Sequence, residues 1–331
     1  MSRRQECIWV SWQRHRRTDS LIAYMGVPLY VMTSRQSRII KHPLFAMRTL
    51  VLLLNSRPRV LIVQNPSIAL TTLAAFAKLV FRYRLVVDAH NAGVYIHERQ
   101  HSLLNWIFRK LHQAADITIV TNQILADIVE SNGGRPFVLP DPLPVLEYAG
   151  SEAGGTTGAG FFVVTVVCTF ASDEPYLAVF EAAKLLPEDV QVRITGDPSR
   201  IEESITPALD SDRLVLLGYL PEAQYVDALA TSDIVIDLTT RQDCLVCGAY
   251  ESVALGVPLI LSDTPVSRQY FTRGVVYTKN TAEGIAEAVL HARANLPALQ
   301  SAIRSFREEV QIAWEEKYRE FRDSLSRFLL L

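Results

Sequence analysis

Cysteine is scarce in this sequence, and its four cysteines are not spaced as a disulfide framework. Three of them lie in apolar stretches, so we expect a reducing compartment and a cytoplasmic protein. Long hydrophobic runs are also missing. The longest, residues 70–81, contains Lys78 and falls short of the roughly 20 residues that a membrane span needs. The apolar run after the basic N-terminus is too short for a secretory signal. We therefore expect a protein that does not cross a membrane.

The net charge is only −2, but the two halves of the chain have opposite signs. Residues 1–150 contain 18 Lys and Arg against 9 Asp and Glu, whereas residues 151–331 contain 15 against 26. Basic surfaces attract anionic ligands and anionic membranes. We expect peripheral membrane association through the first half, at Arg35, Arg38, Lys41, Arg48, Arg57 and Arg59. Nucleic acid is a competing partner, but no nucleic-acid-binding motif is present.

Short apolar segments alternate with helical ones along the whole chain. The predicted strands are residues 7–12, 28–32, 59–64, 84–90, 116–121, 136–140, 161–168, 190–196, 214–218, 233–238, 258–262 and 274–278. This alternation predicts an α/β protein with two doubly wound parallel-sheet domains, and ligands bind such sheets at the carboxyl ends of the strands. The glycine-rich stretch 149–160 reads as the linker between them. Its glycines resemble a dinucleotide fingerprint, but they precede a strand instead of following one.

Residues 243–263 read as a loop, a helix opened by Gly248, and a strand. Cys244 and Cys247 form a C-x-x-C, but zinc needs four ligands and no second pair is nearby, so we interpret them as packing residues. The backbone N–H groups of the loop and the helix N-terminus suit a diphosphate, and Glu251 suits the hydroxyls of a ribose. The alternatives are an exposed turn carboxylate for Asp243 and a solvated helix residue for Glu251.

The spacing of Asp243 and Glu251, followed by a G-x-P-L-I strand, resembles the E-x7-E motif of family 4 glycosyltransferases with the GT-B fold. Residues 168–186 and 85–96 are similar to segments of dolichyl-diphosphochitobiose mannosyltransferases. The resemblance implies two Rossmann-like domains facing across a cleft: an acceptor domain at 1–150 and a nucleotide-sugar domain at 151–305. The last helix, 306–331 with Trp314, resembles the GT-B tail that returns to the first domain.

The same resemblance assigns site residues. His90 and Asp243 are the expected catalytic residues. The expected donor-binding residues are Thr169, Ser172, Gly196, Tyr219, Arg241, Cys244, Leu245, Val246, Cys247, Gly248 and Glu251. For the acceptor we expect Arg14, His15, Arg16, Arg17, Asp19 and Asn91, because arginines bind diphosphates well.

The predicted function is transfer of a hexose from a nucleotide-diphosphate sugar to an acceptor hydroxyl, on a polyprenyl-diphosphate-linked saccharide, in polysaccharide or glycolipid synthesis. No metal or cofactor is expected. The two resemblances imply opposite stereochemistry, which stays open. The sequence departs from the family in having Asp243 in place of Glu, no glycine in its first loop, and no Lys or Arg in residues 170–175. A nucleotide-sugar 2-epimerase and a non-catalytic, partner-binding GT-B protein therefore remain alternatives, and Arg241 and Arg268 are candidates to replace the missing clamp.

Overall fold

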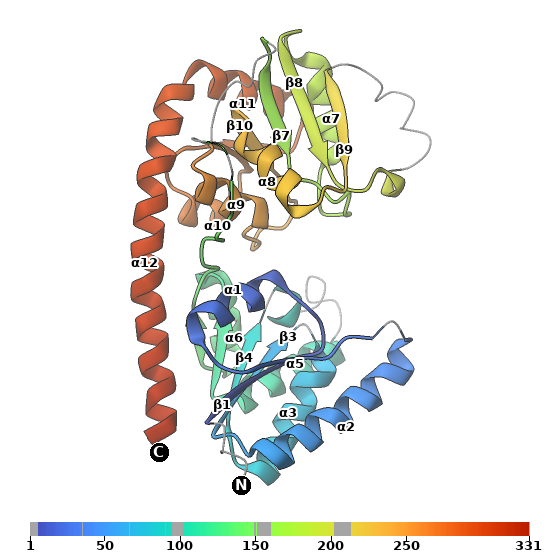
Figure 1. Ribbon diagram of the computed structural model, residues 1–331, viewed down its shortest axis with the longest axis vertical. Helices are drawn as coiled ribbons and strands as arrows, with labels where there is room; N and C mark the ends of the chain where they lie inside the picture. The colour runs from blue at the N-terminus through green and yellow to red at the C-terminus, as the bar shows by residue number, and fades with distance from the viewer. Residues whose placement is uncertain are drawn as a thin grey trace. The chain divides into compact units, whose positions relative to one another are not determined.

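The computed structural model describes residues 6–34, 36–65, 67–89, 91–94, 102–148, 150, 160–201 and 213–330. Contacts within the chain divide it into two compact units, Met1–Pro142 with Ala313–Leu331, and Leu143–Ile312 (Figure 1). Most of the predicted linker lies outside the described residues, and the domain boundaries given by the sequence stay predictions.

The first unit is built on a parallel sheet. Its described strands are β1 (Cys7–Ser11), β2 (Leu29–Val31), β3 (Val60–Asn65), β4 (Arg84–Ala89), β5 (Ile117–Val120) and β6 (Pro136–Val138). They pair in the order β2-β1-β3-β4-β5-β6, with Ile8 opposite Leu61 and Val86 opposite Ile117. The strand order therefore reverses at β1, which lies between β2 and β3.

Helices cover both faces of this sheet because its strands are apolar on both sides. Its helices are α1 (Arg16–Met25), α2 (Arg38–Ser56), α3 (Ile68–Phe81), α4 (Asn91–Val94), α5 (Ser102–Ala114), α6 (Gln123–Ser131) and the end of α12 (Leu296–Leu330). On one face, Trp9 and Val60 of the sheet are buried with Leu21 of α1 and Phe321 of α12. On the other face α2, α3 and α6 pack, with α2 beside α3 (Figure 1).

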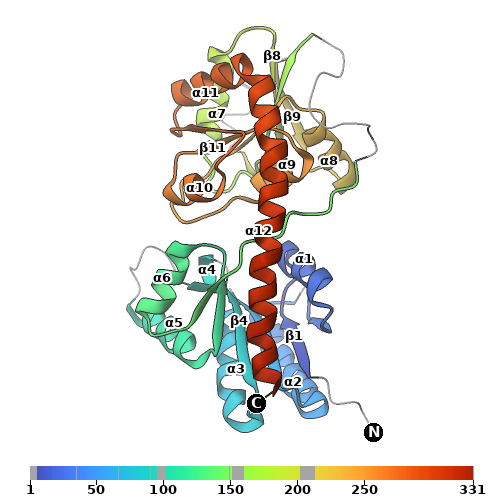
Figure 2. The ribbon, with the colours of Figure 1, turned by 90° about the vertical axis from the view of Figure 1, so that its left-hand side faces the viewer.

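The second unit repeats this plan. Its described strands are β7 (Phe162–Val166), β8 (Val190–Thr195), β9 (Leu214–Gly218), β10 (Ile234–Asp237), β11 (Leu259–Ser262) and β12 (Val275–Thr278), in the order β12-β11-β10-β7-β8-β9. Its helices are α7 (Tyr176–Leu185), α8 (Glu222–Ala230), α9 (Cys247–Leu255), α10 (Pro265–Tyr270), α11 (Ala282–Ala294) and the start of α12. α7 and α11 lie side by side on one face (Figure 2). α8, α9, α10 and α12 cover the other.

Each predicted strand is present, and the prediction of two parallel α/β sheets is confirmed. Three helices were not predicted: α1, α4 and α10. The first loop expected after β1, residues 11–20, ends earlier than expected, because α1 begins at Arg16. The sequence pattern of a helix was weak at α1, because its first turn is polar and charged and its buried face depends mainly on Leu21.

Candidate functional site

The second sheet offers a binding position at its carboxyl edge. β7 lies between β10 and β8, so the strand order reverses there. In doubly wound sheets the loops part at such a point and leave room for a ligand. The loops after β7 and β10 and the N-terminus of α9 all start at this edge, and most of the predicted donor-binding residues belong to them.

One carboxylate organises the loop after β7. Glu174 accepts hydrogen bonds from the backbone N–H groups of Thr169 (2.8 Å) and Ala171 (3.0 Å), and from the Thr169 hydroxyl (2.9 Å). Between them Phe170 has a φ of 58°, which is unusual for a bulky residue. Thr169 and the exposed Ser172 were predicted donor-binding residues, whereas Glu174 was not. Glu174 therefore holds this loop in a fixed, unusual conformation.

The next strand ends against this loop at Gly196, a predicted donor-binding residue. Its φ is 107°, and a Cβ atom built on it would lie 2.4 Å from the carbonyl oxygen of Cys168. Its N–H donates to the carbonyl of Gly218 at 3.0 Å. Only glycine combines this φ with so close a backbone approach. Tyr219, another predicted donor-binding residue, comes directly after Gly218, and 86% of its surface is exposed.

The N-terminus of α9 is capped by a carboxyl group that the sequence did not point out. Asp237, the last residue of β10, accepts a hydrogen bond of 2.8 Å from the N–H of Gly248. Burial, followed by the charges of Glu251 and Glu174, raises the pKa of Asp237 well above its ordinary value. Gly248 was predicted to offer its N–H to a phosphate, and here that N–H is used by Asp237. The same burial that raises this pKa disfavours a negative charge on Asp237, and so reduces its opposition to an anion at this helix end.

Both acids of the predicted motif are buried. Asp243 is 7% exposed and Glu251 is 4% exposed. The alternatives of an exposed turn carboxylate and a solvated helix residue are therefore wrong. The hydroxyl of Tyr225 on α8 donates a hydrogen bond to Oε2 of Glu251. Tyr225 was not identified from the sequence, because nothing in the spacing of α8 distinguishes it from a packing residue.

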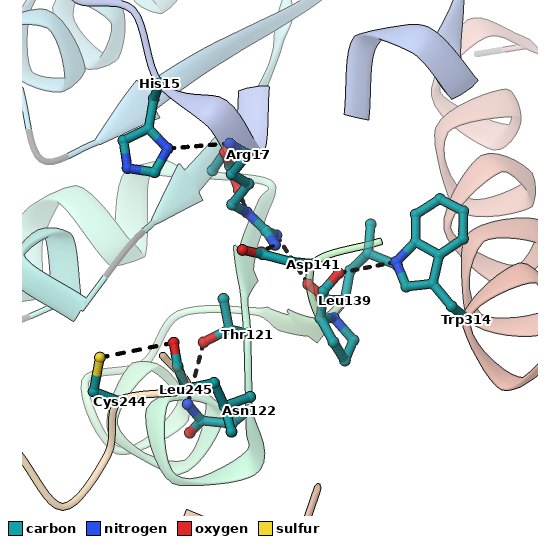
Figure 3. Close-up of polar contacts among 11 residues, drawn as sticks. His15, Arg17, Thr121, Asn122, Leu139, Asp141, Cys244, Leu245 and Trp314 are labelled. Carbon is teal, nitrogen blue, oxygen red and sulfur yellow. Dashed lines mark hydrogen bonds and ion pairs between the residues drawn. The ribbon is translucent and has the colours of Figure 1, made fainter. Parts of the chain in front are cut away.

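The cysteines of the motif take different positions. Cys247 is exposed, so its interpretation as a packing residue is wrong. The Cys244 thiol lies 3.8 Å from the carbonyl oxygen of Leu245 (Figure 3). Burial raises the pKa of Cys244 to about 12, so its thiol is protonated at neutral pH. Leu245 and Val246 pack against an apolar cluster. Within the described residues, no group of three or more His, Cys, Asp or Glu side chains is arranged to hold a metal ion.

The two arginines considered as clamp residues are both ion-paired. Nε of Arg241 lies 3.0 Å from Oδ2 of Asp173, and about half of the Arg241 side chain is exposed. Arg268 pairs with Asp263 through two nitrogens, at 2.5 and 2.9 Å. Both pairs are accessible to water, where an ion pair contributes little to stability, so an anionic ligand can compete for either arginine.

In the first unit the predicted acceptor residues follow β1. Arg17 is buried and donates to Asp88 at 2.9 Å. It also donates to Asp141 and to the carbonyl of Leu139, the latter at 2.9 Å (Figure 3). Burial alone lowers the pKa of Arg17, but the charges of Asp88 and Asp141 reverse this and raise it. The donors of Arg17 are engaged in joining α1 to β4 and to the segment after β6. Binding of an acceptor by Arg17 stays a prediction.

The neighbouring acceptor candidates are placed differently. His15 is the N-cap of α1, and its Nδ1 accepts from the N–H of Arg17 at 3.3 Å. Burial lowers the pKa of His15, against the opposing charges of Asp88 and Asp141. Arg14 is exposed and pairs with Asp19 at 3.1 Å. His90 lies outside the described residues, and the side chains of Arg16 and Asn91 lie outside them too.

Comparison with known proteins finds similarity in structure only. No protein-family model and no curated protein matches the sequence. Sucrose-phosphate synthase from Thermosynechococcus elongatus matches with a TM-score of 0.75 and 14% identity over 99% of both chains. HepE of Anabaena, in complex with UDP and glucose, matches with a TM-score of 0.74 and 14% identity over 96% of this chain and all of that one. A glycosyltransferase from Rickettsia africae matches with a TM-score of 0.71 and 12% identity, over 98% of this chain and 99% of that one.

These similarities and the two parallel sheets show that the chain has the GT-B fold. Membership of family 4 and the likeness to dolichyl-diphosphochitobiose mannosyltransferases stay predictions.

Proposed function

We propose that this chain is a glycosyltransferase that transfers a sugar from a nucleoside-diphosphate sugar to an acceptor hydroxyl. The observation that carries the proposal is the buried Glu251, one helical turn inside the capped N-terminus of α9, at the point where the strand order reverses. A carboxylate there offers two oxygens to the hydroxyls of a ribose, and a helix N-terminus favours a diphosphate. The GT-B fold, shared with a protein crystallised with UDP and glucose, supports the proposal.

In this proposal each group has one role. Glu251 binds the ribose, and Tyr225 holds the Glu251 carboxylate in place. Negative charge develops on the diphosphate as the sugar–phosphate bond breaks, and the N-terminus of α9 stabilises that charge. Asp243 lies near the transferred sugar, and His90 or an acid removes the proton of the acceptor hydroxyl. Arg241 exchanges Asp173 for a phosphate when the donor binds.

We propose a polyprenyl-diphosphate-linked saccharide as the acceptor. The positive balance of residues 1–150 supports an anionic acceptor. The exposed Arg14 is the arginine best placed to meet it, because Arg17 is already buried and paired. The sugar transferred is proposed to be a hexose, in line with the motif that contains Asp243 and Glu251.

The test is calorimetric titration of the full chain with UDP, GDP, dTDP and ADP. We expect one nucleotide to bind, and Glu251→Gln to weaken it by about tenfold or more, since hydrogen bonds to a charged group are lost. Glu287→Gln is the matched control, because Glu287 is exposed on α11 and should leave the affinity unchanged. Binding of no nucleotide by a correctly folded chain would favour the non-catalytic alternative.

A second measurement separates transfer from epimerisation. With the nucleotide sugar that corresponds to the bound nucleotide, a transferase releases nucleotide faster when a lipid-linked saccharide is added. A 2-epimerase interconverts the sugar without any acceptor, and this outcome would contradict the proposed transfer.

A further inference from the structure

The outward face of α2 is apolar, although the helix already buries its opposite face. Phe45, Thr49 and Leu53 are buried against the sheet side of the first unit. On the other side apolar residues recur at steps of seven, four and three residues, which places them along one face. We call this row, Ile40, Met47, Val51 and Leu54, the apolar stripe. Its exposed fractions are 57% for Ile40, 57% for Met47, 50% for Val51 and 55% for Leu54. A helix that covers a sheet ordinarily carries polar residues on this side.

The neighbouring helix extends the apolar surface. α3 packs beside α2 (Figure 1). At its C-terminal end Phe76, Leu79 and Val80 are 69%, 77% and 76% exposed. Leu79 and Val80 follow Phe76 by three and four residues, so both neighbour it on one face of the helix. Single exposed apolar residues are ordinary, but a grouping of large ones marks an interaction site.

The charge around these helices has one sign. Between Asp19 and Asp88 the sequence contains no acidic residue and nine Lys and Arg. Arg48 is exposed on α2 and Arg82 is exposed directly after α3. A hollow of about 720 Å³ beside Leu79 is lined by four cations, Arg59, Lys78, Arg82 and Arg84. Lys78 and Arg84 share the single carboxylate of Asp116, so the hollow keeps a positive balance.

We propose that the exposed apolar side chains of α2 and α3, with Arg48 and Arg82, form a lipid-docking face that binds an anionic bilayer. The apolar side chains enter the boundary between headgroups and acyl chains, with α2 parallel to the surface. The cations contact anionic headgroups, and each contributes roughly a fivefold gain in binding. None of the described helices is long and apolar enough to cross the bilayer, so the attachment is to one surface.

A second copy of this chain is a poorer occupant for the same face. A twofold contact between identical faces would bring two acid-free, basic surfaces together. Like charges placed opposite each other across an interface oppose association. An anionic bilayer instead matches both properties of the face, its exposed apolar side chains and its positive charge. This inference goes beyond the proposed function, because it holds whatever reaction the carboxyl edges of the sheets support.

The experiment is co-sedimentation of the full chain with sucrose-loaded vesicles. One set contains phosphatidylcholine alone, and the other contains phosphatidylcholine with phosphatidylglycerol. We expect binding to the anionic set, decreasing with added salt, and little binding to the neutral set. The double variant Phe76→Ser with Leu79→Ser should bind the anionic vesicles at least about tenfold more weakly. Serine, unlike phenylalanine and leucine, gains no free energy by moving from water into the acyl-chain boundary. Arg48→Glu with Arg82→Glu should lose about tenfold or more.

Matched controls lie in the second unit. Leu185→Ser removes an exposed apolar side chain of α7, 54% exposed, and Arg304→Glu reverses an exposed charge on α12. Both should bind vesicles as the unaltered chain does. All substituted positions are exposed, so unchanged circular dichroism should accompany each variant. The proposal is overturned if the unaltered chain does not bind anionic vesicles, or if the α2 and α3 variants bind them as well as the controls do. It is overturned equally if the chain forms a dimer that these variants dissociate, since a second copy then covers the face.

Discussion

Asp237 and Gly248 constrain each other at the edge of the second sheet. The Asp237 carboxylate accepts from the Gly248 N–H at 2.8 Å, and a Cβ atom on Gly248 would lie 2.6 Å from the same carboxylate oxygen. Glycine is therefore required at the first turn of α9 so that the carboxyl group at the end of β10 can cap the helix. The cap fixes the position of α9, and with it Glu251.

Asp237→Asn should raise the stability of the chain at neutral pH. Burial, with the charges of Glu251 and Glu174, raises the pKa of Asp237 when the chain is folded. The folded state then binds more protons than the unfolded state between the two pKa values, so this residue's contribution to the unfolding free energy falls as pH rises. Asparagine keeps an acceptor oxygen without the charge. Thermal melts should show a higher Tm for the variant, with the difference shrinking toward acidic pH.

The matched control for this substitution is Asp227→Asn, at an exposed position of α8. It should leave the pH dependence of the Tm as it is. A variant Asp237→Asn that melts lower than the unaltered chain at neutral pH would show that the carboxylate is needed in its charged form.

Tyr225→Phe should weaken nucleotide binding less than Glu251→Gln does. The Tyr225 hydroxyl donates to Oε2 of Glu251 and so orients the carboxylate. Its loss leaves the carboxylate present but less well placed, which should cost about threefold to tenfold in affinity. Steady-state kinetics should show a higher KM with little change in kcat, as expected of a residue that acts through binding. An affinity loss as large as that of Glu251→Gln would mean that Tyr225 contacts the nucleotide itself.

Gly196→Ala should destabilise the chain by about 2–4 kcal/mol, because both the backbone conformation and the space forbid a Cβ atom. The φ is 107°, and the Cβ would lie 2.4 Å from the Cys168 carbonyl oxygen. Gly218→Ala is the control: its φ is 74°, but nothing lies within 4 Å of its Cβ position. It should cost about 1–2 kcal/mol. Urea unfolding of both variants measures the difference, and equal losses would remove the steric part of the argument.

Arg17→Met should destabilise the chain by about 3–5 kcal/mol, because it leaves Asp88 buried without its cation. Adding Asp88→Asn should recover part of the loss. Arg14→Met removes an exposed pair with Asp19 and should cost at most about 1 kcal/mol. Chemical unfolding of the single and double variants tests this. If Arg17→Met unfolds like Arg14→Met, the buried ion pair does not hold α1 to β4.

His112 should make stability fall in mild acid. Burial lowers its pKa from 6.5 to about 4, against the effect of the Gly93 backbone. Between these values the unfolded state binds more protons, so stability contributed by the neutral ring is complete above pH 6.5 and is lost as the pH falls toward 4. The loss amounts to about 3 kcal/mol. His112→Gln should make the unfolding free energy less dependent on pH over this range. If its slope against pH is unchanged in the variant, other groups cause the loss of stability in mild acid.

Several site features were predictable from the sequence because they are local. The strands were recognised from continuous apolar runs, and the acids of the motif from their spacing on a loop and the helix after it. Asp237, Glu174 and Tyr225 were missed for a different reason. Asp237 and Tyr225 act on residues brought to them by the sheet order or by helix packing, and the sequence places Tyr225 and Glu251 on separate helices with no pattern that links them. Glu174 acts within its own loop, on Thr169 and Ala171, but such a loop leaves no periodic pattern in the sequence.

Apolar periodicity and turn residues act over short stretches of chain. The sequence alone therefore predicts the alternation of strands and helices, the two parallel sheets, and the positions of Asp243 and Glu251 on a loop and the helix after it. Which charged groups are free to meet a ligand depends on the tertiary structure. In the folded chain Arg17 is buried between Asp88 and Asp141, and the Gly248 N–H donates to Asp237 at the start of α9. The apolar stripe of α2 is exposed. Burial and pairing depend on segments distant in sequence, so no local pattern contains them.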